Sequence, residues 1–248
     1  MSRFSVSGTA IVTGGSKGIG RAIAERFIED GADVVICSRT EEEVKETADE
    51  IGAVGVACDV TDGDAVENLV ETTVDEYDSV DVLVNNAGAS FMSNFDGITP
   101  NGWDRVVDIN LGGTYNCTRA AGEHLKQSNG SIVNFASVAG VQGAPYMSHY
   151  AAAKAGIINF TKTLAYEWAS EGVRTNCVAP GFVATPGVQS QMGVTADEID
   201  RGDPDRTIGE PAEIADLVRF LASPASSFVN GETVVARGVP DIMESPEV

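Results

Sequence analysis

Short runs of apolar residues alternate with longer amphipathic stretches along most of the chain. The apolar runs are brief and rich in β-branched residues, which favours buried strands, and they cover 9–13, 33–37, 53–58, 80–84, 131–135, 173–179 and 231–236. The stretches between them have helical character, over about 18–30, 41–51, 64–77, 103–127, 150–170 and 212–221. This alternation predicts an α/β fold in which helices cover both faces of a doubly wound parallel sheet.

Some helix ends and the longest connection can also be predicted. Gly31 ends the first helix, and Thr40 followed by Glu43 predicts a capping box at the start of the second. No repeat or low-complexity linker interrupts the series, so we expect residues 1–248 to form a single domain. The least regular stretch, 180–211, is long for a connection in a compact domain, and such loops often form lids or binding loops.

Composition narrows the class of protein. Of the 248 residues, 43% are hydrophobic, which is enough for one large core. No run of about twenty apolar residues occurs, and the start MSRFSVSG lacks the features of a signal peptide, so we expect a cytoplasmic protein without a membrane span. The cysteines lie far apart in apolar surroundings, which indicates reduced core residues and no metal site; they are Cys37, Cys58, Cys117 and Cys177.

The charge balance is strongly acidic. Sixteen basic residues stand against 37 acidic ones, for a net charge of −21, so nucleic acid is not an expected partner. A surface of this kind repels itself at low ionic strength and is tolerated where salt screens it, because the Debye length falls to about 3 Å at 1 M salt. We therefore favour a salt-loving host, with an ordinary acidic protein as the alternative.

A glycine-rich turn follows the first predicted strand. The segment TGGSKGIG (13–20) would open the first helix and direct backbone N–H groups, together with the positive end of that helix, toward a pyrophosphate. The spacing of Gly14, Gly18 and Gly20 differs from G-x-G-x-x-G and matches T-G-x-x-x-G-x-G. In this motif the chain resembles the short-chain dehydrogenase/reductase family. The resemblance implies a single-domain, Rossmann-type fold and a nicotinamide cofactor.

The end of the second strand indicates which nicotinamide cofactor binds. An acid about 20 residues after the glycines would bond the ribose 2′-OH and repel a 2′-phosphate. Here Ser38 and Arg39 follow the strand, and Lys17 in the glycine turn adds a second positive charge. Because a guanidinium forms a fork on a phosphate, we expect NADP(H) in preference to NAD(H). The alternative for Arg39 is a solvated surface residue.

Four polar residues match the catalytic tetrad of the family, in order and in element. Tyr150 and Lys154 in YAAAK share one helix face, Ser137 precedes Tyr150 by 13 residues, and Asn110 lies in an earlier helix. The resemblance implies that Tyr150 is the acid/base, that Ser137 bonds the substrate oxygen, and that Asn110 holds a water linking Lys154 to solvent. Because an ammonium favours the phenolate, we expect Lys154 to lower the pKa of Tyr150.

The resemblance also implies a set of cofactor contacts at the strand ends. They are Gly14, Ser16, Lys17, Gly18, Ile19, Gly20, Ser38, Arg39, Asp59, Val60, Asn86, Ala87, Gly88, Tyr150, Lys154, Pro180, Gly181, Val183 and Thr185. Residues 181–210 are expected to form a substrate lid. Apolar residues that suit either the substrate pocket or the core are Phe91, Met92, Val138, Tyr146, Met147, Phe182 and Val188.

The expected activity is hydride transfer between NADP(H) and a small carbonyl or secondary-alcohol substrate, with 3-oxoacyl thioesters as one substrate class. An enoyl-thioester reductase is an alternative, because LAYEWASEGVRTNCVAPG resembles the corresponding segment of those enzymes. A non-catalytic nucleotide-binding regulator is another, against which the intact tetrad argues. The epimerases and dehydratases of the extended branch are longer and have a different glycine spacing. The family implies a homotetramer, although the C-terminal segment 234–238 departs from the usual Val-Asp-Gly-Gly.

Overall fold

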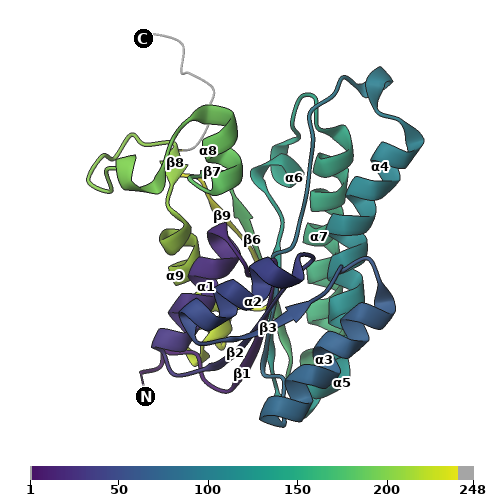
Figure 1. Cartoon of the computed structure of the whole chain (residues 1–248), viewed down its shortest axis with the longest axis vertical. Coiled ribbons are helices and arrows are strands. Elements are labelled where there is room, and N and C mark those ends of the chain that lie inside the picture. The colour runs from purple at the N-terminus through teal and green to yellow at the C-terminus, as the bar shows by residue number, and fades with distance from the viewer. Residues whose placement is uncertain (1, 240–248) are drawn as a thin grey trace.

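A seven-stranded sheet forms the centre of the protein (Figure 1), in a computed structural model that describes residues 2–239. The strand order is β3-β2-β1-β4-β5-β6-β9, and all neighbours are parallel. The strands are β1 (Thr9–Thr13), β2 (Asp33–Ser38), β3 (Val54–Ala57), β4 (Val82–Asn85), β5 (Ser131–Phe135), β6 (Arg174–Pro180) and β9 (Thr233–Ala236). The predicted α/β class and doubly wound parallel sheet are confirmed.

Helices cover both faces of this sheet, as Figure 1 shows. One face carries α1 (Gly18–Glu29), α2 (Glu41–Ile51) and α9 (Pro211–Ala222). The other carries α3 (Gly63–Tyr77), α4 (Pro100–Val107), α5 (Gly113–Ser128) and α7 (Ser148–Glu167). The short elements α6 (Val138–Gln142), α8 (Pro186–Met192), β7 (Phe182–Val183) and β8 (Ile208–Gly209) lie beyond the carboxyl edge of the sheet.

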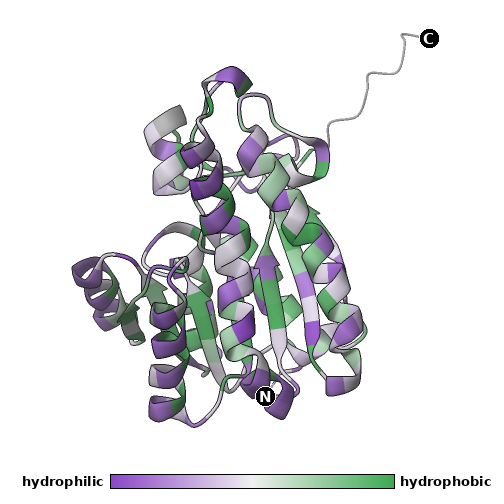
Figure 2. Cartoon of the chain, turned by 90° about the vertical axis from the view of Figure 1, so that its right-hand side faces the viewer, coloured by the Kyte–Doolittle hydropathy of each residue, from purple (hydrophilic) through white to green (hydrophobic). Residues whose placement is uncertain are grey.

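Alternation along each central strand builds two cores. In β1, Ala10 and Val12 face the α1 side while Ile11 faces the α5 side, and all three side chains are fully buried. Because both faces are covered, the strands read as continuous apolar runs. Figure 2 shows hydrophobic strands enclosed by helices whose outer faces are hydrophilic.

The predicted helix over 103–127 is wrong in its bounds and its continuity. It begins earlier, at Pro100, because Thr99 caps it by accepting a hydrogen bond from the Gly102 N–H at 3.1 Å. It is then interrupted by a π-helical turn at Asp108–Gly112 before it continues as α5. Periodicity does not reveal this turn, because it covers only five residues within an otherwise α-helical stretch.

Two further expectations change in detail. Thr40 precedes α2 without making a side-chain cap, and Glu43 bonds elsewhere, so the predicted capping box is wrong. The irregular stretch 180–211 contains α8 and the two-stranded pair β7–β8.

Within the described range, the four cysteines are buried free thiols, and no cluster of potential metal ligands is found. In the same part of the chain, no helix has the length and apolar character needed to cross a bilayer.

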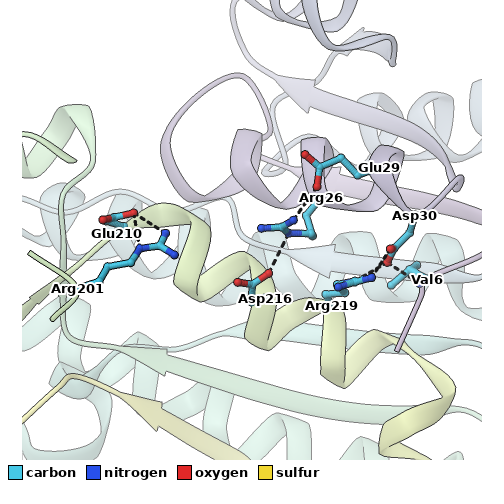
Figure 3. A network of polar contacts seen from close by, with 8 residues as sticks. All are labelled: Val6, Arg26, Glu29, Asp30, Arg201, Glu210, Asp216 and Arg219. Atoms are coloured by element: carbon cyan, nitrogen blue, oxygen red, sulfur yellow. Dashed lines mark hydrogen bonds and ion pairs between the residues drawn. The ribbon is translucent and has the colours of Figure 1, made fainter. Parts of the chain in front are cut away.

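Ion pairs join the first and the last long helices (Figure 3). The Arg219 guanidinium donates to both oxygens of Asp30, at 2.6 and 2.5 Å, and the Val6 N–H donates to the same carboxylate at 2.9 Å. Arg26 bridges Glu29 and Asp216 beside them. Burial opposes ionisation of Asp30, but the bonds from Arg219 and Val6 outweigh it, so the pKa of Asp30 lies below its ordinary value.

We expect Asp30→Asn to lower the free energy of unfolding by about 1–3 kcal/mol at neutral pH, because the Asp30 side chain is only 6% exposed and holds two charge-assisted bonds. Since folding lowers the pKa of Asp30, its contribution is complete above the unfolded value of about 4 and is lost as pH falls through the folded value. Urea unfolding at pH 7 and at about pH 2–3 measures both effects.

Glu29→Gln is the matched control, because Glu29 makes one exposed ion pair and should change stability by less than about 0.5 kcal/mol. Equal losses from the two variants would contradict a special role for the Asp30 pair.

Candidate active site

Two cavities lie at the carboxyl edge of the sheet, where the strand order reverses between β1 and β4. This is the position at which doubly wound sheets bind their ligands. The glycine-turn cavity, of about 350 Å³, borders Gly14 and residues 16–19, and the Tyr150 cavity, of about 330 Å³, borders Ser137, Tyr150 and Lys154. Shared lining residues make them one continuous cleft; they are Ile19, Asn86, Gly88, Ala89 and Thr185.

The glycine turn leaves no room for side chains at its three motif positions. Gly14 and Gly18 have φ values of +65° and +56°, which L side chains rarely adopt. A Cβ at Gly20 would overlap the carbonyl oxygen of Gly14. No side chain caps α1, so its first N–H groups remain available to a ligand. A bare turn before a helix N-terminus fits the pyrophosphate of a dinucleotide.

Asn86 fixes this turn to the neighbouring strand. Its side-chain amide donates to the carbonyl oxygens of Thr13 and Gly14, at 2.9 and 3.2 Å. The backbone N–H groups of Asn86 and Ala87 both donate to the Thr13 hydroxyl at 3.0 Å. The predicted cofactor segment 86–88 therefore determines the shape of the cleft as well as lining it.

The residues predicted to select the cofactor lie together at the far end of the glycine-turn cavity. Ser38 and Arg39 line it beside Lys17, and Asp59 and Val60 line it where β3 ends. Sequence reasoning missed Glu43, which lines the same cavity and accepts hydrogen bonds from the Ser16 hydroxyl and the Lys17 ammonium, both at 3.0 Å. Its position three residues into a helix suggested a cap, which concealed this role.

In the Tyr150 cavity, three predicted residues converge from two elements. Ser137 is the N-cap of α6, and its hydroxyl accepts a bond from the Ala139 N–H at 3.2 Å. Tyr150 and Lys154 lie one turn apart near the start of α7, with the ammonium 5.5 Å from the centre of the phenol ring. The Lys154 ammonium donates to the Phe135 carbonyl oxygen at 2.7 Å.

Burial governs the ionisation of the two groups. Burial lowers the pKa of Lys154 to about 8. Burial also raises the pKa of Tyr150, and a hydrogen bond with Ser137 offsets only part of that rise. The expectation that the pKa of Tyr150 is lowered is therefore wrong for the protein alone, because burial of the phenol raises that pKa and the opposing contribution comes from Ser137.

Asn110 lies in the π-helical turn and is fully buried. Its amide nitrogen donates to the carbonyl oxygens of Ala89 and Val106, at 2.7 and 2.8 Å, while its Oδ1 has no partner among the described residues. A Cβ at Gly88 would lie 2.7 Å from this Oδ1 and 3.5 Å from the Lys154 ammonium. The missing side chain of Gly88 thus leaves a gap between an unsatisfied acceptor and a donor, which suits one water molecule.

Most other predicted residues line one of the two cavities. Those at the glycine-turn cavity are Gly14, Ser16, Lys17, Gly18, Ile19, Ser38, Arg39, Asp59, Val60, Asn86, Ala87, Gly88 and Thr185; those at the Tyr150 cavity include Pro180, Gly181 and Val183. Gly20 lies behind the turn against Gly14. Lining residues that no motif indicated are Cys37, Thr40, Glu43, Cys58, Ala89, Ser90, Ile109, Phe135, Ala136, Pro186 and Gly187.

Of the apolar residues expected at the substrate pocket, most do not line the Tyr150 cavity. Val188 lines the Tyr150 cavity, whereas Phe182 lines a separate cavity of about 150 Å³ with Arg206 and Ile208. Phe91 packs edge-on against the buried His149 ring, with 4.4 Å between ring centres. The others do not line the Tyr150 cavity; they are Met92, Val138, Tyr146 and Met147.

Comparisons with known proteins cover nearly the whole chain. Residues 14–238 match the family model described as Enoyl-(Acyl carrier protein) reductase. The short-chain reductase protein NovJ of Streptomyces niveus is 41% identical over 242 residues, 92% of each chain. The 3-oxoacyl-[acyl-carrier-protein] reductases of Synechocystis sp. and Chlamydia muridarum are both 40% identical; the alignments cover 90% and 96% of this chain and 93% and 99% of those proteins.

A solved structure has the same fold. A short-chain type dehydrogenase/reductase from Mycobacterium marinum aligns with a TM-score of 0.86 and 30% identity, over 95% of this chain and 96% of its own.

The position of Lys154 generates a pH prediction. Its ammonium is charged below pH about 8 and becomes neutral above it. Carbonyl reduction places negative charge on oxygen, which a cation stabilises, so kcat/KM for reduction should fall as pH rises through about 8. Lys154→Arg should be slower but should keep its rate to higher pH, because a guanidinium stays charged. A wild-type profile that is flat to pH 9.5 or so would contradict this assignment.

Proposed function

The chain belongs to the short-chain dehydrogenase/reductase family, and from that membership we propose that it reduces 3-oxoacyl thioesters to 3-hydroxyacyl thioesters. It is an NADP(H)-dependent oxidoreductase acting on a small carbonyl or alcohol substrate. The observation that carries the proposed substrate class is the name of the relatives in Synechocystis sp. and Chlamydia muridarum, which are 40% identical over nearly their full lengths.

The residues of the cleft fit this cofactor. The bare turn at Gly14 and Gly18 would hold the pyrophosphate, and Lys17 and Arg39 would face the 2′-phosphate. Lys154 would hold the nicotinamide ribose. When bound, NADPH supplies the hydride that the carbonyl carbon receives.

The proposed proton path runs through this chain's own side chains. Tyr150 gives its phenol proton to the carbonyl oxygen, while the Ser137 hydroxyl donates a hydrogen bond to the same oxygen. The high pKa of Tyr150 keeps it protonated at neutral pH, ready to act as an acid. Lys154 then returns a proton to Tyr150, and solvent would replace the proton of Lys154 through a water that Asn110 Oδ1 holds in the gap beside Gly88.

Enoyl-thioester reduction is the second candidate, because the matching family model carries that description. The convergence of Ser137 and Tyr150 at one point of the cavity favours the carbonyl reaction, in which a single oxygen atom needs both a proton and a hydrogen bond. Assaying NADPH oxidation with matched 3-oxoacyl and 2-enoyl thioesters separates the two.

Further features of the assignment remain proposals. Residues 181–210, which include α8 and the β7–β8 pair, are proposed to close over the bound substrate as a lid. We place the enzyme in the cytoplasm as a homotetramer, on the strength of the family's general organisation. We also propose that it is adapted to a salt-rich interior, because 37 acidic residues exceed the 16 basic residues that could pair with them.

Tyr150→Phe should lower kcat for 3-oxoacyl thioester reduction by at least about 10²–10⁴-fold, because it removes only the proton donor. NADPH affinity, measured by fluorescence titration, should stay nearly unchanged. Tyr166→Phe is the matched control: it makes the same change on the same helix, at a side chain that is 88% exposed. Retention of more than about a tenth of wild-type activity by Tyr150→Phe would exclude it as the acid.

The melting temperature of the cofactor-free protein should rise steeply between low salt and molar KCl, because screening removes self-repulsion among the acidic residues. KCl also stabilises proteins in other ways, so the comparison needs a variant of lower charge. Glu42→Gln, Glu46→Gln and Asp49→Asn neutralise three exposed positions of α2, and the triple variant should show a smaller rise. Identical salt profiles for the two proteins would count against the adaptation.

A further inference from the structure

Glu43 places a negative charge inside the region where the 2′-phosphate of NADP(H) is expected. It is the third residue of α2, and its Oε1 accepts hydrogen bonds from the Ser16 hydroxyl and the Lys17 ammonium, both at 3.0 Å. It lines the glycine-turn cavity together with Ser38 and Arg39. One carboxylate therefore occupies the position at which a phosphate would meet Lys17.

The two cations of this region, Lys17 and Arg39, differ in whether they already form an ion pair. Lys17 is already paired with Glu43, whereas the Arg39 side chain makes no hydrogen bond or ion pair within residues 2–239. The bonds from Lys17 and Ser16 hold the pKa of Glu43 below its ordinary value, so the carboxylate is charged at neutral pH. Arg39 acts on Asp59 through its charge, which helps to lower the pKa of that carboxyl, but of the two cations it is the one that can receive a phosphate without breaking a hydrogen bond or ion pair.

The strength of the Lys17–Glu43 ion pair determines whether a bound phosphate can displace Glu43 from Lys17. The pair is open to solvent, with 66% of the Lys17 side chain and 36% of the Glu43 side chain exposed, and such pairs change an equilibrium by about fivefold at most. A phosphate carries up to two charges and three acceptor oxygens, so it can take Lys17 from Glu43. The phosphate nevertheless binds more weakly than it would to a free Lys17, because it must first displace Glu43.

We propose that Glu43 competes with the 2′-phosphate for Lys17 and thereby determines how strongly the enzyme prefers NADP(H) to NAD(H). The inference rests on the NADP(H)-dependent function given above and adds a residue that opposes the phosphate. In this arrangement, Arg39 provides most of the preference for NADP(H), and Glu43 limits what Lys17 adds to that preference.

Neutralising Glu43 should be tolerated by the fold. A glutamine at position 43 can still accept a bond from the Ser16 hydroxyl. A second bond, from the Thr47 hydroxyl to the Ser16 carbonyl oxygen at 3.1 Å, also holds α2 against the turn. Glu42→Gln is the matched control, because Glu42 is the adjacent exposed acid of the same helix and the same charge is lost.

The test is calorimetric binding of adenosine 2′,5′-bisphosphate and of AMP, two probes that differ only in the 2′-phosphate. Glu43→Gln should bind the bisphosphate about fivefold more tightly than wild type, because the phosphate no longer has to break one exposed ion pair to reach Lys17. AMP affinity should change by less than about twofold, and Glu42→Gln should leave both affinities within that range. Unchanged or weaker bisphosphate binding by Glu43→Gln, or an equal gain in Glu42→Gln, would overturn the proposal.

A double-mutant cycle tests the part played by Lys17. In a Lys17→Met background, the gain from Glu43→Gln should fall below about twofold, because there is no longer a cation to compete for. A gain that persists at full size would show that Glu43 does not act through Lys17.

Kinetics then connect binding to turnover. The ratio of kcat/KM with NADPH to that with NADH should rise in Glu43→Gln by the same factor as the bisphosphate affinity. The nucleotide titrations need no carbonyl substrate, so they remain decisive if 3-oxoacyl thioesters prove not to be substrates. In that outcome the proposed substrate class fails while the inference about Glu43 stands or falls on its own data.

Discussion

Hydrogen bonds between Thr13 and the segment that follows β4 join the ends of β1 and β4, the two strands between which the strand order of the sheet reverses. The Thr13 hydroxyl accepts from two successive N–H groups, and the Asn86 amide returns bonds to the carbonyl oxygens of Thr13 and Gly14. On one side, this junction fixes the glycine turn that faces the pyrophosphate. On the other, it sets the position of Gly88, whose missing side chain leaves the gap between Asn110 and Lys154. The phosphate end and the reacting end of the cleft therefore depend on the same few bonds.

The reacting end shows how burial prepares side chains for their work. Lys154 is 3% exposed, so its charge is costly to maintain, and its pKa falls toward working pH, where it can exchange a proton. The same environment disfavours the phenolate of Tyr150 and keeps it a proton donor. The two shifts have opposite signs and one main cause, which is burial.

Sequence predicted the strands well, because a strand covered on both faces needs a continuous apolar run whatever its neighbours are. It also predicted the residues that approach the cleft from strand ends, since parallel strands bring their carboxyl ends to one edge. It failed where tertiary contacts override a local preference. Glu43 had a local partner in Thr40 and bonded instead to Lys17, which is 26 residues away. The pKa of Tyr150 depended on burial, which spacing alone does not report.

The pairing of α1 with α9 has a consequence for how the chain emerges during synthesis. The Asp30–Arg219 contact spans 189 residues, and the fully buried side chains Ile23 and Phe27 of α1 belong to the core that α9 completes. At ordinary translation speeds, the ribosome needs roughly 10 to 40 s to make the intervening segment. During that time, the apolar face of α1 has no α9 to cover it. The nascent chain must therefore remain soluble by other means, and dense acidic charge on α2, already synthesised by then, would oppose its aggregation.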